Sequence, residues 1–234
     1  MEKSLVKLEE RYIKNSLALS VEEVNLLHNK KVCVIGCGGL GGHVVELLAR
    51  IGIGTITVVD DDVFEISNLN RQLFSTEKVL GVPKVEVAKQ RIREVNSQIY
   101  FKGMHIQLDE NNGEEIIKGH DIVVDALDNM KTRLILERVC NRLSIPFVHG
   151  SIGGWYGQVA SIFPGDDTLH KIYQNVKGEK GEETVFGNLS FIVSLVASIQ
   201  CAECVKILIR RGKILQKEML QIDLLSGEFY TMQL

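Results

Sequence analysis

The chain has 234 residues, of which 45% are hydrophobic and 24% charged, a mixture typical of a globular protein with a buried core. The net charge of -3 argues against a protein that binds nucleic acid over a broad surface, so nucleic acid is not expected as a partner. The first residues, MEKSLVKLEERYIKN, have mixed charge and lack the apolar run of a secretion signal. Five cysteines without such a signal indicate reduced thiols and a cytoplasmic location.

Short apolar runs alternate with helical patterns along most of the chain. Strands are expected at 30–36, 54–60, 98–108, 121–127, 146–154 and 157–163. Helices are expected at 3–19, 21–28 (with Ser20 as N-cap), 41–52, 84–95, 114–120, 130–143 and 188–211. This order predicts an α/β fold: a Rossmann-like open, mostly parallel sheet with flanking helices, N-terminal helices and a C-terminal β-hairpin that turns at Ser226 and Gly227.

We expect one domain over residues 1–234. Its parts are an N-terminal helical arm (1–29), a nucleotide-binding core (30–163), a mobile crossover loop (164–187) and a core or dimer helix with the hairpin (188–234). The crossover segment is polar, rich in glycine and longer than an ordinary connection. The last helix is very apolar, but it contains Glu203 and Lys206, which favours a buried helix over a membrane span.

A glycine-rich loop joins the first expected strand to the next helix. Gly36, Gly38 and Gly41 have the spacing G-x-G-x-x-G, which lets the backbone approach a phosphate at the start of a helix. Asp60 ends the following strand, where a Rossmann unit carries its ribose-binding acid. The loop therefore predicts nucleotide binding, and it does not by itself separate NAD from ATP.

Cationic and amide side chains follow the ribose acid. Asn68, Asn70, Arg71 and Gln72 come soon after Asp60, and Lys84 opens a later helix. A pyrophosphate already held by backbone amides needs no further cations, so this set favours a triphosphate whose charge is neutralised during transfer.

Two acids, Asp125 and Asp128, lie at the carboxyl end of a buried strand, where α/β sheets bind ligands. A carboxylate that faces a polyphosphate usually binds Mg²⁺. Simpler interpretations stay open: Arg71 as an exposed loop residue, Lys84 as a solvated first-turn lysine, and Asp128 as the N-cap of the next helix.

Six segments, in this order, resemble the ThiF/MoeB/HesA group, relatives of the ubiquitin-activating enzymes: RYIKN, GCGGLGG, VVDDDVFEISNLNRQ, GVPKVEVAK, DALDN and SLVASIQCAECVKIL. The resemblance covers nearly the whole chain. It implies ATP-dependent adenylation of the C-terminal glycine of a ubiquitin-like sulfur carrier ending in Gly-Gly, and a homodimer. The pathway, of thiamine or molybdopterin type, is left open.

The resemblance also implies roles for single residues. Arg71, Lys84 and Asp128 would be the catalytic residues, with Mg²⁺ on Asp128. The residues that bind ATP would be Gly36, Gly38, Gly39, Gly41, Asp60, Asp62, Asn68, Arg71, Gln72, Lys84, Asp128 and Asn129. Lys14, where the family usually has arginine, would reach the ATP of the partner subunit, with Arg11 as an alternative. Gly153, Gly154 and Gln158 would lie near the floor of the groove for the carrier's tail.

The cysteines depart from the family pattern. Many relatives carry two CxxC pairs for zinc, but this chain has only Cys201 and Cys204, which we expect to be core residues, and no zinc site. No cysteine lies between Asn141 and Gln200, so a covalent thiol step on this chain is disfavoured and a separate sulfur donor is expected.

Three other functions remain as alternatives. One is a dehydratase of the same superfamily that acts on a modified tRNA base, against which the acidic net charge counts. Another is an NAD-dependent oxidoreductase, for which His149 is the one candidate acid/base, although we interpret it as a core histidine at a strand end. The last is a non-catalytic partner protein that retains the fold.

Overall fold

The computed structural model describes residues 8–166, 168–173 and 186–234, and the described strands form one sheet in the order β3-β2-β1-β4-β5-β6-β7-β8. The strands are β1 (Lys31–Ile35), β2 (Thr55–Val59), β3 (Tyr100–Met104), β4 (Ile122–Asp125), β5 (Phe147–Gly153), β6 (Tyr156–Ile162), β7 (Glu218–Asp223) and β8 (Glu228–Gln233). β1 to β5 pair in parallel, and β6 to β8 add three antiparallel strands. The expected open, mostly parallel sheet and its C-terminal hairpin are confirmed.

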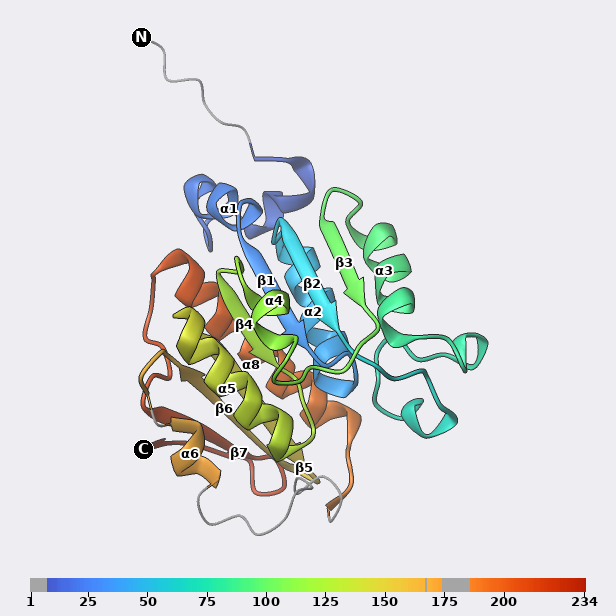
Figure 1. Ribbon diagram of the computed structural model, residues 1–234. Helices are drawn as coiled ribbons and strands as arrows, with labels where there is room; N and C mark the ends of the chain where they lie inside the picture. The colour runs from blue at the N-terminus through green and yellow to red at the C-terminus, as the bar shows by residue number, and fades with distance from the viewer. Residues whose placement is uncertain (1–7, 167, 174–185) are drawn as a thin grey trace.

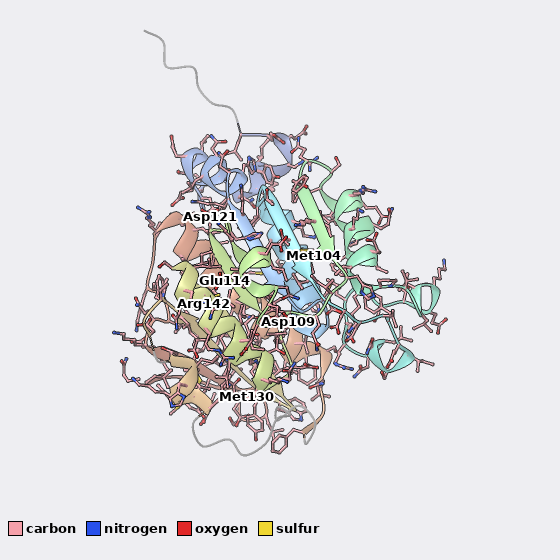
Figure 2. The ribbon with its side chains drawn as sticks, in the orientation of Figure 1. Met104, Asp109, Glu114, Asp121, Met130 and Arg142 are labelled. Atoms are coloured by element: carbon pink, nitrogen blue, oxygen red, sulfur yellow. The ribbon has the colours of Figure 1, made fainter. Side chains whose placement is uncertain are left out.

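Helices cover both faces of this sheet (Figure 1). The α-helices are α1 (Val21–His28), α2 (Gly39–Ile51), α3 (Lys84–Val95), α4 (Gly113–Ile117), α5 (Met130–Leu143), α6 (Thr168–Tyr173) and α8 (Ser190–Ile209), and the 3-10 helices are η1 (Glu10–Asn15), η2 (Ile66–Asn68) and η3 (Glu77–Val79). Side chains from α1, α2, α3 and α8 share one core, and side chains from α4, α5 and α6 share the other. Figure 2 shows Glu114 of α4 beside Arg142 of α5, whose Nε lies 2.6 Å from Glu114 Oε1 across the outer layer.

The helix predicted at 3–19 is wrong in the part that the structure describes. Residues 10–15 form a 3-10 helix, and Leu17 has a φ of 76°, which an α-helix does not allow. Tyr12 is buried and accepts a hydrogen bond from Asn96 at 2.8 Å, so tertiary packing replaces the helical pattern here. The next prediction is confirmed, because Ser20 and Glu23 form a capping box at the start of α1.

The crossover segment predicted as a loop contains a short helix. Residues 168–173 form α6, whose Leu169 is buried in the core beside α5. Positions 167 and 174–185 of this segment lie outside the described residues. The predicted mobility of the segment stays a prediction.

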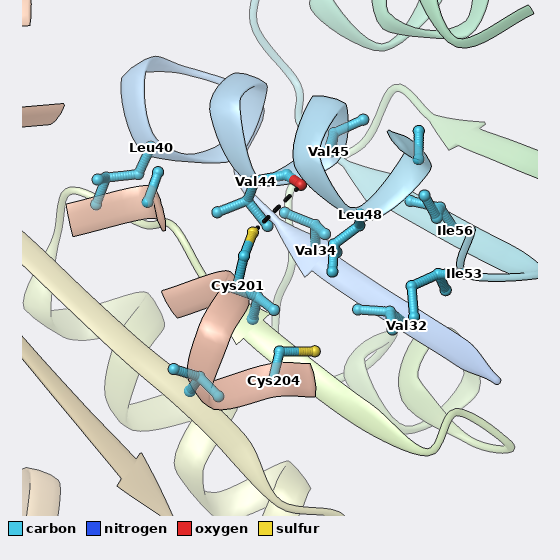
Figure 3. Close-up of a cluster of buried hydrophobic side chains, with 14 of the residues drawn as sticks. Val32, Val34, Leu40, Val44, Val45, Leu48, Ile53, Ile56, Cys201 and Cys204 are labelled. Atoms are coloured by element: carbon cyan, nitrogen blue, oxygen red, sulfur yellow. Dashed lines mark hydrogen bonds between the residues drawn. The ribbon is translucent and has the colours of Figure 1, made fainter. Parts of the chain in front are cut away.

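The apolar helix α8 is a core element. It packs against α2 and β5, and although its length and composition suit a membrane span, 61% of its apolar window is buried inside the protein. Cys201 and Cys204 point into this core, where Cys201 Sγ lies 3.6 Å from Val44 O (Figure 3). The prediction that these two cysteines are core residues is confirmed.

The turn between β1 and α2 leaves no room for a side chain at Gly36 or at Gly41. Gly36 has a φ of +98°, and a Cβ there would lie 2.5 Å from Ala126 O of the loop after β4. A Cβ on Gly41 would lie 1.9 Å from Gly36 O, closer than any real contact. The glycines therefore let the first turn of α2 fold tightly against the end of β1.

We expect Gly41→Ala to lower the free energy of unfolding by about 2–3 kcal/mol, because the added methyl forces backbone to move. The matched control is Gly42→Ala, whose Cβ would have Phe74 Cδ2, at 3.6 Å, as its nearest neighbour, an ordinary van der Waals contact. That control should leave stability unchanged or raise it by up to about 1 kcal/mol, since alanine favours a helix. Urea unfolding of both variants measures the difference, and equal stabilities would contradict the packing described here.

Candidate active site

A pocket of about 260 Å³ opens at the carboxyl ends of β1, β2 and β4. The strand order reverses between β1 and β4, and this reversal is the position at which open α/β sheets bind ligands. The predicted site residues that line the pocket are Gly36, Gly38, Gly39, Asp60, Asp62, Arg71, Gln72, Lys84, Asp128 and Asn129. The structure thus brings the glycine turn, both cations and the acid after β4 to one cavity.

Asp60 joins the glycine turn to the end of β2. Its Oδ2 accepts from Cys37 N at 2.6 Å, and its Oδ1 accepts from Asp62 N at 2.9 Å. Burial raises the pKa of this carboxyl, while the nearby Lys84 ammonium lowers it. The carboxylate is therefore held in one orientation at the pocket wall, as a ribose-binding acid requires.

Lys84 is a buried cation in the first turn of α3. It is 5% exposed, which excludes the solvated first-turn lysine. Its Nζ lies 2.7 Å from Asp62 Oδ2, and the side chain of Asp62 is 67% exposed. An incoming anion can therefore replace Asp62 as the partner of the ammonium group without moving Lys84.

Arg71 and Gln72 follow η2 at the mouth of the pocket. Arg71 Nη1 donates to Ser67 O and to Asn70 Oδ1, each at 2.8 Å, which leaves part of the guanidinium for a ligand. Gln72 is buried, and its Oε1 has no hydrogen-bond partner among the described residues. The side-chain oxygen of Asn188, which also lines the pocket, is likewise buried and without a described partner.

Asp128 and Asn129, which follow β4, have different roles, although the sequence left open which one caps α5. Asn129, and not Asp128, is the N-cap of α5, because Asn129 Oδ1 accepts from Thr132 N at 2.9 Å. Asp128 is exposed at the pocket, and its Oδ1 is 3.3 Å from Asn129 Nδ2. The N-cap interpretation of Asp128 is wrong, and its carboxylate faces the cavity.

Four predicted residues lie outside the pocket lining. Gly41 packs against Gly36 O, so its role is to close the turn. Asn68 Oδ1 accepts from Glu65 N at 3.0 Å and forms the capping box of η2 with Glu65. Arg11 and Lys14 belong to the arm, which lies at the end of the sheet where the parallel strands begin (Figure 1). Both are therefore remote from the pocket.

A buried polar cluster lies beneath the pocket and was not predicted as a unit. Asp125 and His149 are fully buried, with His149 Nδ1 2.7 Å from Asp125 Oδ2. Tyr173 and Arg133 complete the cluster through a 2.9 Å hydrogen bond from Arg133 Nη1. The interpretation of His149 as a core histidine is confirmed, and this placement removes the one acid/base candidate of the oxidoreductase alternative.

A second pocket lies on the antiparallel half of the sheet. It is lined by Ser151, Ile152, Gly153, Tyr156, Gly157, Gln158, Gln221, Ile222 and Tyr230. Gly153 and Gln158, which the family resemblance assigns to the groove for a carrier's tail, line this pocket, while Gly154 pairs with Asn188 beside it. Ile152 lines both cavities, so the two pockets adjoin.

Residues after β3 form a pocket wall that the sequence analysis missed. The pocket lining includes three residues that follow β3, Ile106, Gln107 and Leu108. A signal existed, because the carboxyl ends of neighbouring parallel strands share one edge, and β3 neighbours β2.

Comparison with known proteins gives the following matches. The profile described as the ThiF family matches residues 12–234. The SAMP-activating enzyme E1 of Haloferax volcanii is 34% identical over 88% of this chain and 77% of its own length. The molybdopterin-synthase adenylyltransferase of Haemophilus influenzae is 34% identical over 84% of this chain and 82% of its own length. The crystal structure of E. coli MccB has the same fold, with a TM-score of 0.86 at 22% identity over 97% of this chain and 70% of that chain.

We expect the free energy of unfolding to fall as the pH drops through about 6.5. Burial lowers the pKa of His149, with only partial compensation from Asp125, and burial also lowers the pKa of His43 and His120. The unfolded imidazoles then take up protons that the folded ones exclude, so stability rises with pH across this window. Urea unfolding between pH 5 and 8 measures the slope. His120→Gln should flatten it, and a stability that rises on acidification would contradict the prediction.

Proposed function

The chain belongs to the ThiF family, and from that premise we propose that it uses ATP to adenylate the C-terminal glycine carboxylate of a small ubiquitin-like sulfur-carrier protein. The observation that supports this most is the single pocket that joins the glycine turn, Arg71, Lys84 and Asp128. The relative from Haloferax volcanii is named a SAMP-activating enzyme, and the relative from Haemophilus influenzae is named a molybdopterin-synthase adenylyltransferase.

The residues of the pocket fit a magnesium-bound nucleoside triphosphate. The buried side-chain amides of Gln72 and Asn188 have unused hydrogen-bonding atoms, and an amide can turn either end toward a ligand. Among the described residues no group of three or more acids, histidines or cysteines is placed to hold a metal. A single carboxylate, that of Asp128, is enough for Mg²⁺, because protein sites commonly bind this ion through one or two carboxylates together with substrate phosphates.

The protein would position the two reactants and neutralise the charge of the triphosphate. Bound magnesium-ATP supplies the α-phosphate that the carrier's carboxylate attacks and the pyrophosphate that leaves. The attacking carboxylate is ionised at neutral pH, so no general base is needed. Lys84 and Arg71 would screen the repulsion between that carboxylate and the triphosphate, with Asp60 on the ribose. The buried position of Lys84 strengthens this effect, because water is excluded around it.

The second pocket would hold the carrier's C-terminal tail. It adjoins the nucleotide pocket at Ile152, and Gly153 in its lining carries no side chain to obstruct an extended backbone. A chain that lay along it would present its terminal carboxylate toward the α-phosphate. Such positioning converts a reaction between two molecules into one within a complex.

The sulfur donor would be a separate protein. Burial raises the pKa of Cys33 and of Cys204 to about 12, and it also raises the pKa of the thiols of Cys37, Cys140 and Cys201. Buried thiols that stay protonated are poor nucleophiles. The acyl-adenylate would then leave for another nucleophile in the cytoplasm, in a pathway of thiamine or molybdopterin type.

ATP–pyrophosphate exchange with ThiS-type and MoaD-type carriers tests the proposal, and exchange that depends on one carrier is expected. Asp128→Asn should lower the exchange rate on the order of a hundredfold and raise the magnesium concentration needed, because the amide loses the charge that holds the metal. The matched control is Glu115→Gln, an exposed acid on α4, which should behave as the wild type. Exchange without any carrier dependence, or tRNA-stimulated ATP hydrolysis in its place, would favour the dehydratase alternative.

The chain would work as a homodimer in which Lys14 reaches the partner's nucleotide. Lys14 is exposed on the arm, at the opposite end of the sheet from its own pocket, and has no described partner. Arg11 is the weaker candidate, because its Nη1 already donates to Asn96 Oδ1. Exposed apolar side chains such as Ile66 and Leu17 offer surface that a second copy would bury.

Subunit mixing tests the action of Lys14 across the dimer. Lys14→Ala and Asp128→Asn should each be nearly inactive alone. Mixed one to one with exchange of subunits, they should regain about one quarter of the wild-type rate, since each mixed dimer has one intact site and half of the dimers are mixed. Exchange kinetics before and after mixing measure the gain. A mixture that stays as inactive as its parts would show that Lys14 serves only its own subunit.

A further inference from the structure

Arg133, on the buried side of α5, is a charged side chain that is only 1% exposed. Its guanidinium donates to Leu127 O and to Gly150 O, the latter at 3.3 Å, and its Nε lies 3.4 Å from Asp125 Oδ2. Burying a cation costs several kcal/mol unless acceptors surround it, so these contacts hold the guanidinium in one place. Because Leu127 directly precedes Asp128, the fixed guanidinium also holds the turn that carries Asp128 to the pocket.

The hydroxyl group of Tyr173, the last residue of α6, contacts the side chains of Arg133, Gln158, His149 and Ser151. It accepts from Arg133 Nη1 at 2.9 Å and from Gln158 Nε2 at 3.2 Å, and it lies 3.0 Å from His149 Nε2. The Arg133 and Gln158 nitrogens can only donate to the phenol oxygen, so its one proton is available to His149 Nε2. His149 is then neutral and carries its own proton on Nδ1, where it donates to Asp125 Oδ2.

This hydroxyl connects the two pockets. Gln158 lines the second pocket, and Leu127 and Asp128 line the nucleotide pocket. Among the described contacts, the side chain of Gln158 reaches Arg133 through the Tyr173 hydroxyl. The Tyr173 ring reinforces the connection, since its centroid lies 5.6 Å from the guanidinium carbon of Arg133.

We propose that Tyr173 is a positioning residue for adenylation, whose hydroxyl couples Gln158 in the second pocket to Arg133 and the turn that carries Asp128. Tyr173 lines neither pocket and acts only through its neighbours. The inference rests on the proposed function, in which the carrier's tail occupies the second pocket and the nucleotide the first. A tail that contacts Gln158 then stabilises the same network that orients Asp128.

Tyr173→Phe tests the coupling, because it keeps the ring and removes only the hydroxyl. In ATP–pyrophosphate exchange with a MoaD-type carrier ending in Gly-Gly, we expect the KM for the carrier to rise about tenfold, the size of one lost hydrogen bond to a well-ordered partner. The KM for ATP should stay within about twofold of wild type, because the direct nucleotide contacts remain. Gln158→Leu should have the same effect, and the double variant should again show about tenfold and not a hundredfold.

The matched control is Tyr100→Phe, which removes a hydroxyl from an exposed tyrosine of β3. It should leave both KM values unchanged. Thermal unfolding of each variant separates a loss of folding from a loss of coupling. A Tyr173→Phe enzyme with a wild-type KM for the carrier, or a double variant whose effects multiply, would overturn the inference.

Amide hydrogen exchange at residues 126–129 provides a second measurement that needs no carrier. Tyr173→Phe should speed exchange there about tenfold, since the guanidinium that holds the turn loses one of its anchors. Tyr100→Phe should leave exchange at these amides unchanged. Failure of every carrier to support pyrophosphate exchange in the wild type would sink the proposed function, whereas unchanged amide exchange in Tyr173→Phe would sink the inference on Tyr173.

Discussion

The hydrogen bond from Cys37 N–H to the Asp60 carboxylate, at 2.6 Å, is the contact on which the site depends. It joins the loop after β1 to the end of β2, so that the glycine turn and the ribose acid form one rigid wall. The second oxygen of Asp60 holds the backbone at Asp62, which in turn pairs with Lys84. The Asp60 carboxylate thus connects the loops after β1 and β2 and, through Asp62, the first turn of α3.

The mixed sheet places two binding surfaces side by side. The parallel strands β1 to β5 end at one edge, where their loops supply the polar groups of the nucleotide pocket. β6 runs back antiparallel to β5, and the strands beyond it form the wall of the second pocket. Because β5 belongs to both halves, its Ile152 faces both cavities. A reaction between a nucleotide and a polypeptide tail suits this boundary.

In the described part of the chain, few charged side chains are buried, and each of them has an ionic or hydrogen-bonding partner. Asp125 is fully buried, and although burial raises its pKa, Arg133 and His149 outweigh that effect and keep the pKa low. Glu203 on α8 accepts from Ser161 Oγ and Leu215 N, each at 2.8 Å. Such networks contribute little net stability, but they hold backbone in one geometry. The Asp125 network has that effect on the turn that presents Asp128.

The order of elements was readable from the sequence, since apolar runs, Ser20, Pro83 and Gly52 mark where helices and strands begin and end. The sequence also predicted which residues line the pocket, because each follows a strand that had to end at the same edge of a parallel sheet. These residues are the glycine turn, Asp60, Arg71, Lys84 and Asp128.

The tertiary structure decided what depends on contacts between distant segments. Tyr12 inserted beneath Gly52 turned the expected arm helix into a 3-10 turn. Asn129, and not Asp128, became the N-cap of α5. The contacts of Tyr173 with Arg133 and His149 join three elements, α6, α5 and β5. Local periodicity describes how each segment folds along itself, while hydrogen-bond partners far away in the chain are chosen only when the segments pack together.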